Sequence, residues 1–283
     1  MAFPEESDHS LKDLVEPVNL YINDPLAARL VRWLKPTFVT PNQITYLSVL
    51  VGFASGYSFS HGSLATSMIG GLLLEVALVL DCVDGQLARA KNMASEWGRL
   101  IDGVAGYFAY LAVVYGIMKG FPEYQQALIV VAVMTILRAI SYDYCKQSFA
   151  TMILKGHDGM HQDILNTVIK ISKKKSWVLI GYFYYLQIQQ MFFRGQWNSL
   201  SRMRDENEKS VPQLTLDQRK VYYEKIRPLL TLWRWNGLDL PLFLLALLSL
   251  AGILEIFILP LAIIMPVQYV MTLVFHHLLI HKS

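Results

Sequence analysis

Long apolar blocks separated by shorter polar segments are the dominant pattern along this chain of 283 residues. A bilayer hydrocarbon core of roughly 30 Å requires about 20 mostly apolar residues per helix. We expect every block near that length to be a helix, because lipid offers no hydrogen-bond partner to an open strand edge. Six blocks qualify, at residues 43–60, 63–82, 100–119, 124–145, 237–257 and 259–280. The pattern therefore predicts an all-α integral membrane protein with six transmembrane helices.

A polar leader and an amphipathic segment precede the first block. Residues 1–22 are polar and acidic, and we expect them to be loosely ordered. Asp24 is a candidate N-cap, and Pro25 follows it at the first helical position. From there apolar residues alternate with three cations, which predicts an amphipathic helix that either lies on the membrane surface or packs on the cytosolic loops. The cations are Arg29, Arg32 and Lys35. Thr40, followed by Pro41, is predicted to cap the next helix.

A polar insertion interrupts the apolar blocks. One membrane domain is predicted in four parts, namely the leader 1–22, the amphipathic and first four transmembrane helices 23–146, a cytosolic or interfacial insertion 147–235, and the last two transmembrane helices 236–283. Within the insertion, residues 176–193 are nearly long enough to span. Because Lys173–Lys175 precede them and Arg194 follows, they are predicted to form an interfacial or re-entrant helix. Thr215 is predicted to begin a soluble amphipathic helix.

Composition and charge place the chain outside the soluble globular class. Hydrophobic residues make up 54% and charged residues 17%, and the mean hydropathy is +0.35. The short loops on one side of the membrane carry only Lys119, so both termini and residues 81–106 are predicted to face the cytosol. Cys82 and Cys145 are predicted to stay thiols in that reducing compartment. Basic residues are not interleaved with aromatic ones, so nothing supports nucleic-acid binding.

Three aspartates gather where two of the apolar blocks end. Asp81 and Asp84 are spaced i, i+3, so both carboxylates are predicted on one face of a helix, and Asp102 lies at the start of the next block. Carboxylates converging at the membrane boundary would repel one another and resist desolvation. A bound divalent cation resolves that conflict, and all-oxygen ligation favours Mg²⁺, Mn²⁺ or Ca²⁺ over zinc.

Residues around the aspartates indicate a phosphorylated ligand. Gly85 would let the backbone turn and approach a ligand. Ala88 and Gly98 are small and would leave room between the facing helices for a flat or bulky ligand group. The guanidinium of Arg89 adds a positive charge and several N–H donors in a geometry suited to phosphate. Metal, arginine and backbone room together predict a phosphorylated substrate, with a diphosphate as the best fit. Ordinary polar helix ends would explain Arg89 and Lys91 but not the aspartates.

The stretch from Asp81 to Gly106 resembles the signature of the CDP-alcohol phosphotransferase family, D-x2-D-G-x2-A-R-x8-G-x3-D-x3-D. The chain matches it at Asp81, Asp84, Gly85, Ala88, Arg89, Gly98 and Asp102. The resemblance implies that the aspartates bind two divalent metals, Mg²⁺ or Mn²⁺, and that the glycine, alanine and arginine hold the CDP moiety. It also implies that an alcohol attacks the diphosphate and displaces CMP. Similar proteins commonly form homodimers.

Two polar residues near the start of the first transmembrane block belong to the same context. Asn42 and Thr45 lie in a T-P-N-x-x-T sequence at the predicted cytosolic mouth of that helix. Asn42 is expected to contribute to nucleotide binding. Simple capping of the helix is the alternative for either residue.

Gly106 departs from the family signature, because the last signature position is an aspartate assigned as metal ligand and general base. Glycine can neither accept a proton nor hold a metal. The chain could have lost catalysis, could use a base from elsewhere, or could use the space for a larger acceptor. Other candidate bases are Asp143, His157, Asp158 and His161, although the segment 156–163 around the last three is expected to be a solvated loop.

Glu75 and Arg138 are ionisable residues inside predicted transmembrane blocks. Helical geometry places Glu75 nearly opposite the Asp81 and Asp84 face, so we expect it to pair with Arg138 at a comparable depth. A charged path across the membrane would instead suggest a transporter.

The most direct functional hypothesis is a membrane transferase that moves a substituted phosphate from a CDP-linked donor to an alcohol acceptor, with phospholipid headgroup synthesis as its pathway. The donor would be CDP-diacylglycerol or a soluble CDP-alcohol, and membrane lipid would be a partner. The alternative from another class is a catalytically silent member that binds CDP-linked ligands or partners.

Overall fold

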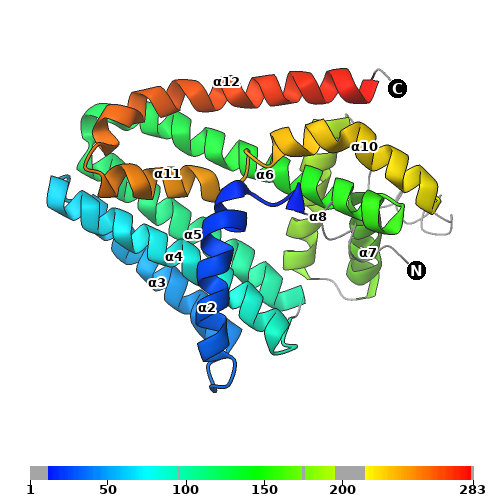
Figure 1. Ribbon diagram of the computed structural model, residues 1–283, viewed down its shortest axis with the longest axis horizontal. Helices are drawn as coiled ribbons and strands as arrows, with labels where there is room; N and C mark the ends of the chain where they lie inside the picture. The colour runs from blue at the N-terminus through cyan, green and yellow to red at the C-terminus, as the bar shows by residue number, and fades with distance from the viewer. Residues whose placement is uncertain (1–11, 95, 174–175, 195–213, 282–283) are drawn as a thin grey trace. The chain divides into compact units, whose positions relative to one another are not determined.

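A computed structural model describes residues 12–94, 96–173, 176–194 and 214–281, with the backbone alone at 96–97, 99–104, 194 and 280–281. These residues form helices and contain no strand, in agreement with the predicted all-α class. The helices in the membrane-type part are η1 (Asn19–Asn23), α2 (Asp24–Leu34), α3 (Pro41–Phe59), α4 (Leu64–Ala90), α5 (Glu96–Gly120), η2 (Pro122–Tyr124), α6 (Gln125–Lys155), α11 (Asp239–Leu250) and α12 (Leu254–His281). The insertion contributes α7 (Gly159–Lys173), α8 (Trp177–Arg194) and α10 (Leu216–Trp233) (Figure 1).

Contacts within the chain divide it into two compact units. The first unit comprises residues 1–14, 139–234 and 275–283, and the second comprises residues 15–138 and 235–274. The second unit contains α2 to α5, all of α11, most of α12 and the first half of α6. It therefore carries the whole predicted signature from Asp81 to Gly106.

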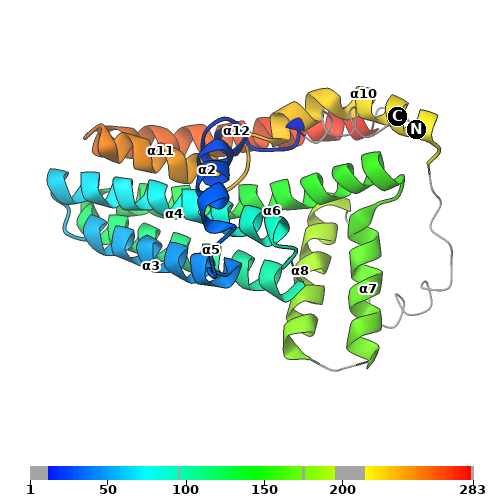
Figure 2. The same cartoon turned by 60° about the horizontal axis from the view of Figure 1, so that its bottom comes forward.

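Small residues let α3 and α5 approach closely in the second unit, where the two helices run side by side (Figure 2). A Cβ placed on Gly116 would lie 1.9 Å from the carbonyl oxygen of Gly56, and one on Gly52 would lie 2.8 Å from the Cβ of Ala109. Neither position can accept a larger side chain without a backbone shift. The glycines therefore fix how closely these two helices pack.

The core of the second unit lies between α3, α4, α5, α6, α11 and α12. Its buried side chains include Phe59, Leu74, Tyr110, Ile117, Leu245 and Ile258. The N-terminus of α11 is held by Glu16, whose Oε2 accepts from the backbone N–H of Leu240 (3.0 Å). A carboxylate at this end also complements the helix dipole.

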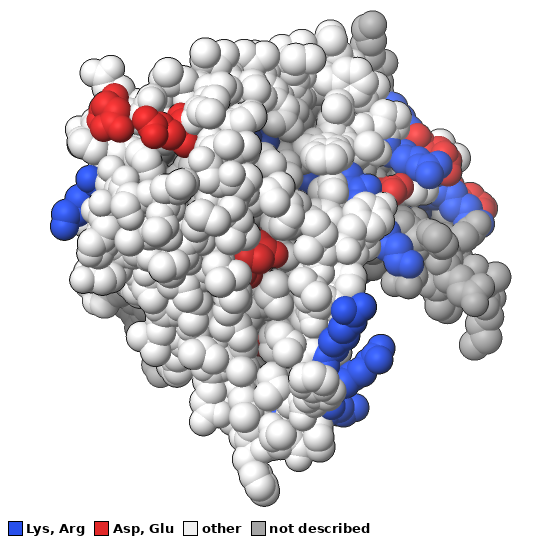
Figure 3. Space-filling model, turned by 60° about the vertical axis from the view of Figure 1, so that its left-hand side comes forward, with Lys and Arg blue, Asp and Glu red and all other residues white. Residues whose placement is uncertain are grey.

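Three helical segments are long and apolar enough to cross a membrane among the described residues, namely Leu64–Ala90, Pro122–Lys155 and Leu254–Leu279. Many large apolar side chains of α12 are exposed, including Ile256, Ile263 and Met271. Much of the face drawn in Figure 3 is likewise uncharged. Exposed apolar surface of this extent is typical of a protein that contacts lipid. These features indicate an integral membrane protein.

The predicted fifth span is wrong in its bounds. The apolar block at 237–257 was expected to be one helix, but α11 has 12 residues and ends at Leu250. At a rise of about 1.5 Å per residue it covers about 18 Å, well short of a bilayer core. The chain turns at Gly252, whose φ of +71° is the left-handed conformation that glycine adopts readily, and α12 begins at Leu254.

Other predicted boundaries also shift. The chain is already helical from Asn19, so Asp24 does not cap an isolated helix, and the leader is ordered from residue 12 to residue 22, with Leu14 and Val18 buried. Residues 1–11 lie outside the described part. Helices α4 and α6 continue to Ala90 and Lys155, beyond the apolar blocks that end at residues 82 and 145.

The predicted helix starts are confirmed at two positions. Pro41 is the first residue of α3, where the Gln43 side chain accepts from the Thr40 N–H (2.9 Å). Thr215 caps α10, with Gln218 completing the reciprocal pair. Both are local signals in which a hydroxyl residue and an amide three positions later satisfy free backbone groups.

The first unit packs α6, α8, α10 and α12 residues around an aromatic cluster. Trp233 is fully buried and its Nε1 lies 3.0 Å from Nδ1 of His276. Phe193 lies against both rings, with centroid distances of 5.8 and 5.9 Å. The predicted helix at 176–193 exists as α8, while Lys174 and Lys175 lie outside the described residues.

Candidate functional site

The two signature aspartates lie near the C-terminal end of α4. Asp81 is partly exposed, whereas Asp84 is buried at 3% exposure. Because α4 is continuous to Ala90, the i, i+3 spacing places both residues on one face, as predicted. The expected backbone turn at Gly85 is wrong, since Gly85 is helical. The helix continues because glycine costs only about 1 kcal/mol there.

Gly85 nevertheless leaves open space beside the aspartates. A Cβ at this position would meet only Nη1 of Arg89, at 3.7 Å, which is an ordinary contact. Protein packing therefore does not require a glycine here. Arg89 is exposed and Ala88 is partly exposed one helical turn further on. The surface of α4 beyond Asp84 thus combines an accessible guanidinium with small residues.

A threonine from the neighbouring helix contacts the buried aspartate. Thr45 on α3 donates from Oγ1 to Oδ2 of Asp84 at 2.5 Å, and both side chains are buried. We expected only capping or a possible ligand contact for Thr45, so this contact was missed. The T-P-N-x-x-T spacing was the available signal, because it places Thr45 one turn after the helix start. Asn42, the other polar residue of that sequence, is exposed.

Helix α2 is fastened to the same end of α4. The side chain of Gln86 donates to Oδ1 of Asp24 (2.8 Å). Lys91, at the end of α4, donates from Nζ to the carbonyl oxygens of Thr37 (2.7 Å) and Val39 (2.6 Å) in the segment before α3. These bonds hold the ends of α2, α3 and α4 together around the aspartates.

Helix α2 has one apolar face and one cationic face, as predicted. Ala27 and Val31 are buried in a small core with Val83 and Leu87 of α4. Arg29 and Arg32 are exposed on the other side. The apolar face of α2 therefore packs on α4, and the cations remain available to solvent or headgroups.

The remaining signature positions lie on α5. Gly98 and Asp102 both belong to this helix, but the side chain of Asp102 lies outside the described residues. Gly106 follows Asp102 by one helical turn and is partly exposed. A Cβ at Gly106 would meet no atom within 4 Å. Among the described atoms, none therefore blocks the Cβ of a larger residue at this position.

The alternative bases belong to the first unit rather than to the unit that carries the signature. Asp158 is buried and accepts from Oγ of Ser148 (3.1 Å) and from the N–H of Met160 (3.0 Å), so it serves the start of α7. Asp143 is exposed on α6. These surroundings give Asp158 a structural role.

The expected solvated loop at 156–163 is wrong. Gly159 begins α7, and residues 158–160 are buried. A Cβ on Gly159 would lie 2.4 Å from the side chain of Thr151, so the turn packs closely against α6. His157 precedes the helix and His161 lies within it. The tight packing of this turn was not visible in its polar composition.

The predicted Glu75 and Arg138 pair is also wrong. Arg138 is buried and donates from Nε to Oδ1 of Asn236 (3.1 Å) and from Nη2 to Oε1 of Gln268 (3.0 Å) and to the carbonyl oxygen of Trp235. The arginine therefore joins α6 to α12 and to the segment before α11. Glu75 is not among its described partners.

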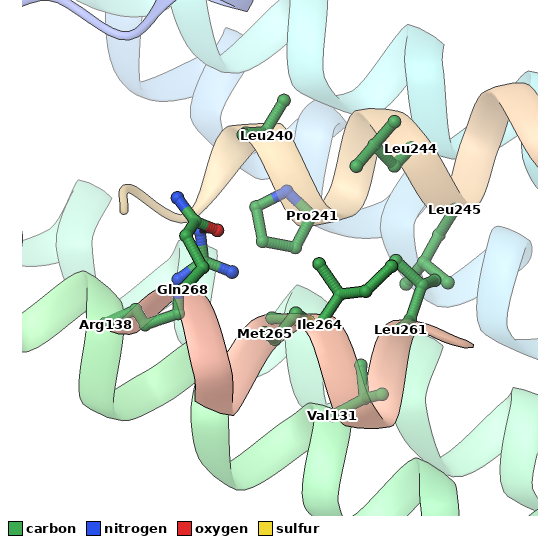
Figure 4. Close-up of a pocket in the computed structure, with 10 residues that line it drawn as sticks. All are labelled: Val131, Arg138, Leu240, Pro241, Leu244, Leu245, Leu261, Ile264, Met265 and Gln268. Atoms are coloured by element: carbon green, nitrogen blue, oxygen red, sulfur yellow. Dashed lines mark hydrogen bonds between the residues drawn. The ribbon is translucent and has the colours of Figure 1, made fainter. Parts of the chain in front are cut away.

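Arg138 also lines a pocket in the second unit, between α6, α11 and α12. Figure 4 shows Arg138 and Gln268 together at one end and apolar side chains such as Pro241 and Ile264 along the rest. The pocket encloses only about 60 Å³. Its volume is far below that of a typical ligand site, which holds several hundred Å³.

The donor chemistry around Asp81 and Asp84 suits a hard divalent cation. Both residues supply carboxylate oxygens, and burial of Asp84 makes a nearby positive charge favourable. Among the described side chains, which do not include that of Asp102, no group of three metal-ligating residues comes together. The two described aspartates therefore supply carboxylate oxygens on one face of α4, and metal binding by them stays a prediction.

The chain belongs to the CDP-alcohol phosphatidyltransferase family, whose model matches residues 38–195. This match covers more than half of the chain and includes α3, α4 and α5 with every signature residue. The aspartates, Gly85, Ala88 and Arg89 described above thus lie in the region that defines the family.

Several curated proteins are similar over shorter regions. The archaetidylinositol phosphate synthase of Pyrococcus horikoshii is 30% identical over 99 residues, which are 35% of this chain and 50% of that protein. The ceramide phosphoethanolamine synthase of Drosophila melanogaster is 31% identical over 99 residues, which are 34% and 25% of the two chains. The bifunctional IPC transferase and DIPP synthase of Aquifex aeolicus is 29% identical over 110 residues, which are 36% and 24%. The similarity spans half or less of each relative's length.

Proposed function

We propose that this protein is a membrane transferase that moves a substituted phosphate from a CDP-linked donor to an alcohol, with release of CMP. The observation that carries the proposal is the pair Asp81 and Asp84 on one face of α4, inside the region that matches the family. Two of the similar proteins are named as synthases of archaetidylinositol phosphate and ceramide phosphoethanolamine. These names support phospholipid headgroup synthesis as the pathway.

Asp81, Asp84 and Asp102 would hold the divalent metal, with Mg²⁺ or Mn²⁺ as the candidates. A metal bound there would neutralise charge on the diphosphate and favour departure of CMP. Burial of Asp84 keeps its carboxylate in a defined position rather than in bulk water. The exposed Arg89 guanidinium would bind a donor phosphate, and Gly85 and Ala88 leave room for the nucleotide. Asn42 and Gly98 complete the proposed nucleotide contacts.

In the proposed reaction the acceptor oxygen forms a bond to the phosphorus distal to cytidine. The bond from that phosphorus to the bridging oxygen breaks, and CMP leaves with the bonding electrons. The proton of the acceptor hydroxyl must pass to a base. Gly106 cannot take it, so we propose a bound solvent molecule or a substrate phosphate oxygen as the group that accepts the proton, whereas Asp143, His157, Asp158 and His161 remain predictions from the sequence alone.

The membrane topology, the donor and the oligomeric state are part of the same proposal. Six helices would cross or enter the membrane, with both termini and the aspartates on the cytosolic side. The donor would be CDP-diacylglycerol or a soluble CDP-alcohol, and two copies would associate as a homodimer. The second candidate function is a silent member that binds CDP-linked ligands without turnover, and the specific observation favouring it is Gly106.

The decisive test is release of CMP by the purified protein in lipid nanodiscs containing diacylglycerol, with Mg²⁺ or Mn²⁺ present. CDP-choline, CDP-ethanolamine, and CDP-diacylglycerol with inositol phosphate would be compared as substrates. We expect metal-dependent CMP release that falls at least about 10²-fold in Asp84→Asn, because catalysis depends on the charge of the aspartate. Asp217→Asn, an exposed change on α10, serves as the control.

Three outcomes separate the candidate functions. CMP release that is lost in Asp84→Asn but kept in Asp217→Asn supports the enzyme. Binding of CDP without turnover for any of the substrates favours the silent member. Equal CMP release by wild type and Asp84→Asn would refute the assignment of this site.

A further inference from the structure

Thr45 connects α3 to the buried aspartate of α4 across 39 positions of sequence. Its Oγ1 lies 2.5 Å from Oδ2 of Asp84 and 3.3 Å from the carbonyl oxygen of Pro41, one turn earlier in α3. The exposed fractions are 5% for Thr45 and 3% for Asp84. This hydroxyl therefore contacts Asp84 away from bulk water.

The hydroxyl has one proton and two neighbouring acceptors. A threonine in a helix commonly donates to the carbonyl four residues earlier, and Pro41 offers that acceptor. The contact to Asp84 is much shorter, and a carboxylate is a stronger acceptor than an amide carbonyl. With Asp84 ionised, the proton therefore points to Oδ2 rather than to the helix backbone. The geometry favours a directed bond to the aspartate over routine satisfaction of a helical threonine.

We propose that Thr45 is a positioning residue that orients the Asp84 carboxylate for a divalent cation, a role that rests on the proposed metal-dependent function. Its hydroxyl engages Oδ2 and fixes the rotation of the carboxylate about its Cβ–Cγ bond. The plane of the carboxylate then determines the direction in which Oδ1 and the remaining lone pairs of Oδ2 point. Groups that hydrogen-bond a metal-ligating carboxylate in this way tune metal affinity.

A purely structural role for Thr45 makes a different prediction. In that case the hydroxyl would only tie α3 to α4, as Ser55 does by donating from its Oγ to the carbonyl oxygen of Gly70 on α4 (2.8 Å). Ser55 is also fully buried and lies on α3, but its acceptor is a backbone oxygen away from the aspartates. Ser55→Ala is therefore a matched control that removes a buried hydroxyl bond between the same two helices.

The test is Mn²⁺ binding to the whole chain in detergent. Binding is measured by calorimetry and, separately, by the loss of the electron paramagnetic resonance signal of free Mn²⁺. We expect Thr45→Val to weaken Mn²⁺ binding about 10- to 100-fold, the typical effect of removing the partner of a metal ligand. Thr45→Ser keeps the hydroxyl and is expected to bind within about threefold of wild type. Ser55→Ala is expected to bind Mn²⁺ as tightly as wild type. Asp84→Asn shows how far the Mn²⁺ affinity falls when a metal ligand itself is lost.

Each pattern of results has a definite meaning. Weak binding in Thr45→Val with recovery in Thr45→Ser supports the proposal. Unchanged binding in Thr45→Val, or an equal loss in Ser55→Ala, overturns it while leaving the metal site intact. Unchanged binding in Asp84→Asn would instead refute the metal site of the proposed function. If Thr45→Val does not fold, as judged by melting without metal, Thr45→Ala replaces it in the comparison with Thr45→Ser.

Discussion

Replacement of Gly106 by aspartate is the most informative change in this protein. The substitution adds a carboxylate to α5 one helical turn after Asp102, at the last position of the family signature. The Cβ would meet no described atom within 4 Å, so the added Cβ itself requires no shift of the α5 backbone. Aspartate is also a slightly better helix former than glycine, by a few tenths of a kcal/mol. The change therefore tests chemistry with little structural penalty.

The expected effect is an increase in turnover. A positioned general base contributes about 10²- to 10⁴-fold to the rate. Each factor of ten corresponds to about 1.4 kcal/mol of activation free energy, so the gain amounts to about 2.7–5.4 kcal/mol. The added carboxylate also places a further negative charge on α5 after Asp102. We therefore expect Gly106→Asp to need a divalent metal for full stability, because the cation offsets repulsion between the carboxylates.

The assay is CMP release in nanodiscs at saturating metal and donor, with kcat and KM determined separately. Gly106→Asn is the matched control, because its side chain has the same size but cannot act as a base at neutral pH. A rise in kcat with aspartate but not with asparagine would identify position 106 as the missing base. Equal rates for wild type and Gly106→Asp, with both proteins folded and binding Mn²⁺, would refute this reasoning.

Two further predictions concern packing and buried charge. Gly116→Ala is expected to destabilise the protein by about 1–3 kcal/mol, because its Cβ would lie 1.9 Å from the carbonyl oxygen of Gly56, and this clash outweighs the helix-propensity gain. Thermal unfolding in detergent measures the effect, and Gly181→Ala is the control because a Cβ added at that helical glycine would meet no described atom within 4 Å. Equal melting of the two variants would contradict the close approach of α3 and α5. Arg138→Met is expected to cost about 1–3 kcal/mol in the same measurement, because it leaves the buried amide oxygen of Asn236 and the partly buried amide oxygen of Gln268 without this donor. The exposed Arg32→Met is expected to change stability by no more than about 0.5 kcal/mol. A small effect for Arg138→Met would show that the polar network contributes little.

Local sequence signals predicted much of the helical structure. Thr40 and Thr215 begin helices where their caps indicate, because capping involves residues only three positions apart. Asp81 and Asp84 share a face because helical periodicity alone decides it. The turn at Gly252 was missed for a related reason, since apolar residues lie on both sides of it and the hydrophobic pattern shows no interruption.

Contacts between distant residues could not be predicted in the same way. Glu75 and Arg138 were paired because they lie at similar depths in two helices, but the rotation of each helix decides which groups meet. Arg138 faces Asn236 and Gln268 in the structure, about 100 positions or more further along the chain. The turn at Gly159 was taken for a solvated loop because its polar side chains conceal how closely the backbone packs against Thr151.

The sequence by itself determined the helical class, the carboxylate spacing on α4 and the resemblance to a family that the comparison then confirmed. These properties depend on residue type and on separations of a few positions. Only the tertiary structure decided that Thr45 reaches Asp84, that Gly106 has room for a side chain and that Gly56 meets Gly116. The physical reason is that each of these depends on how one helix is rotated and placed against its neighbours, which only packing of the whole unit determines.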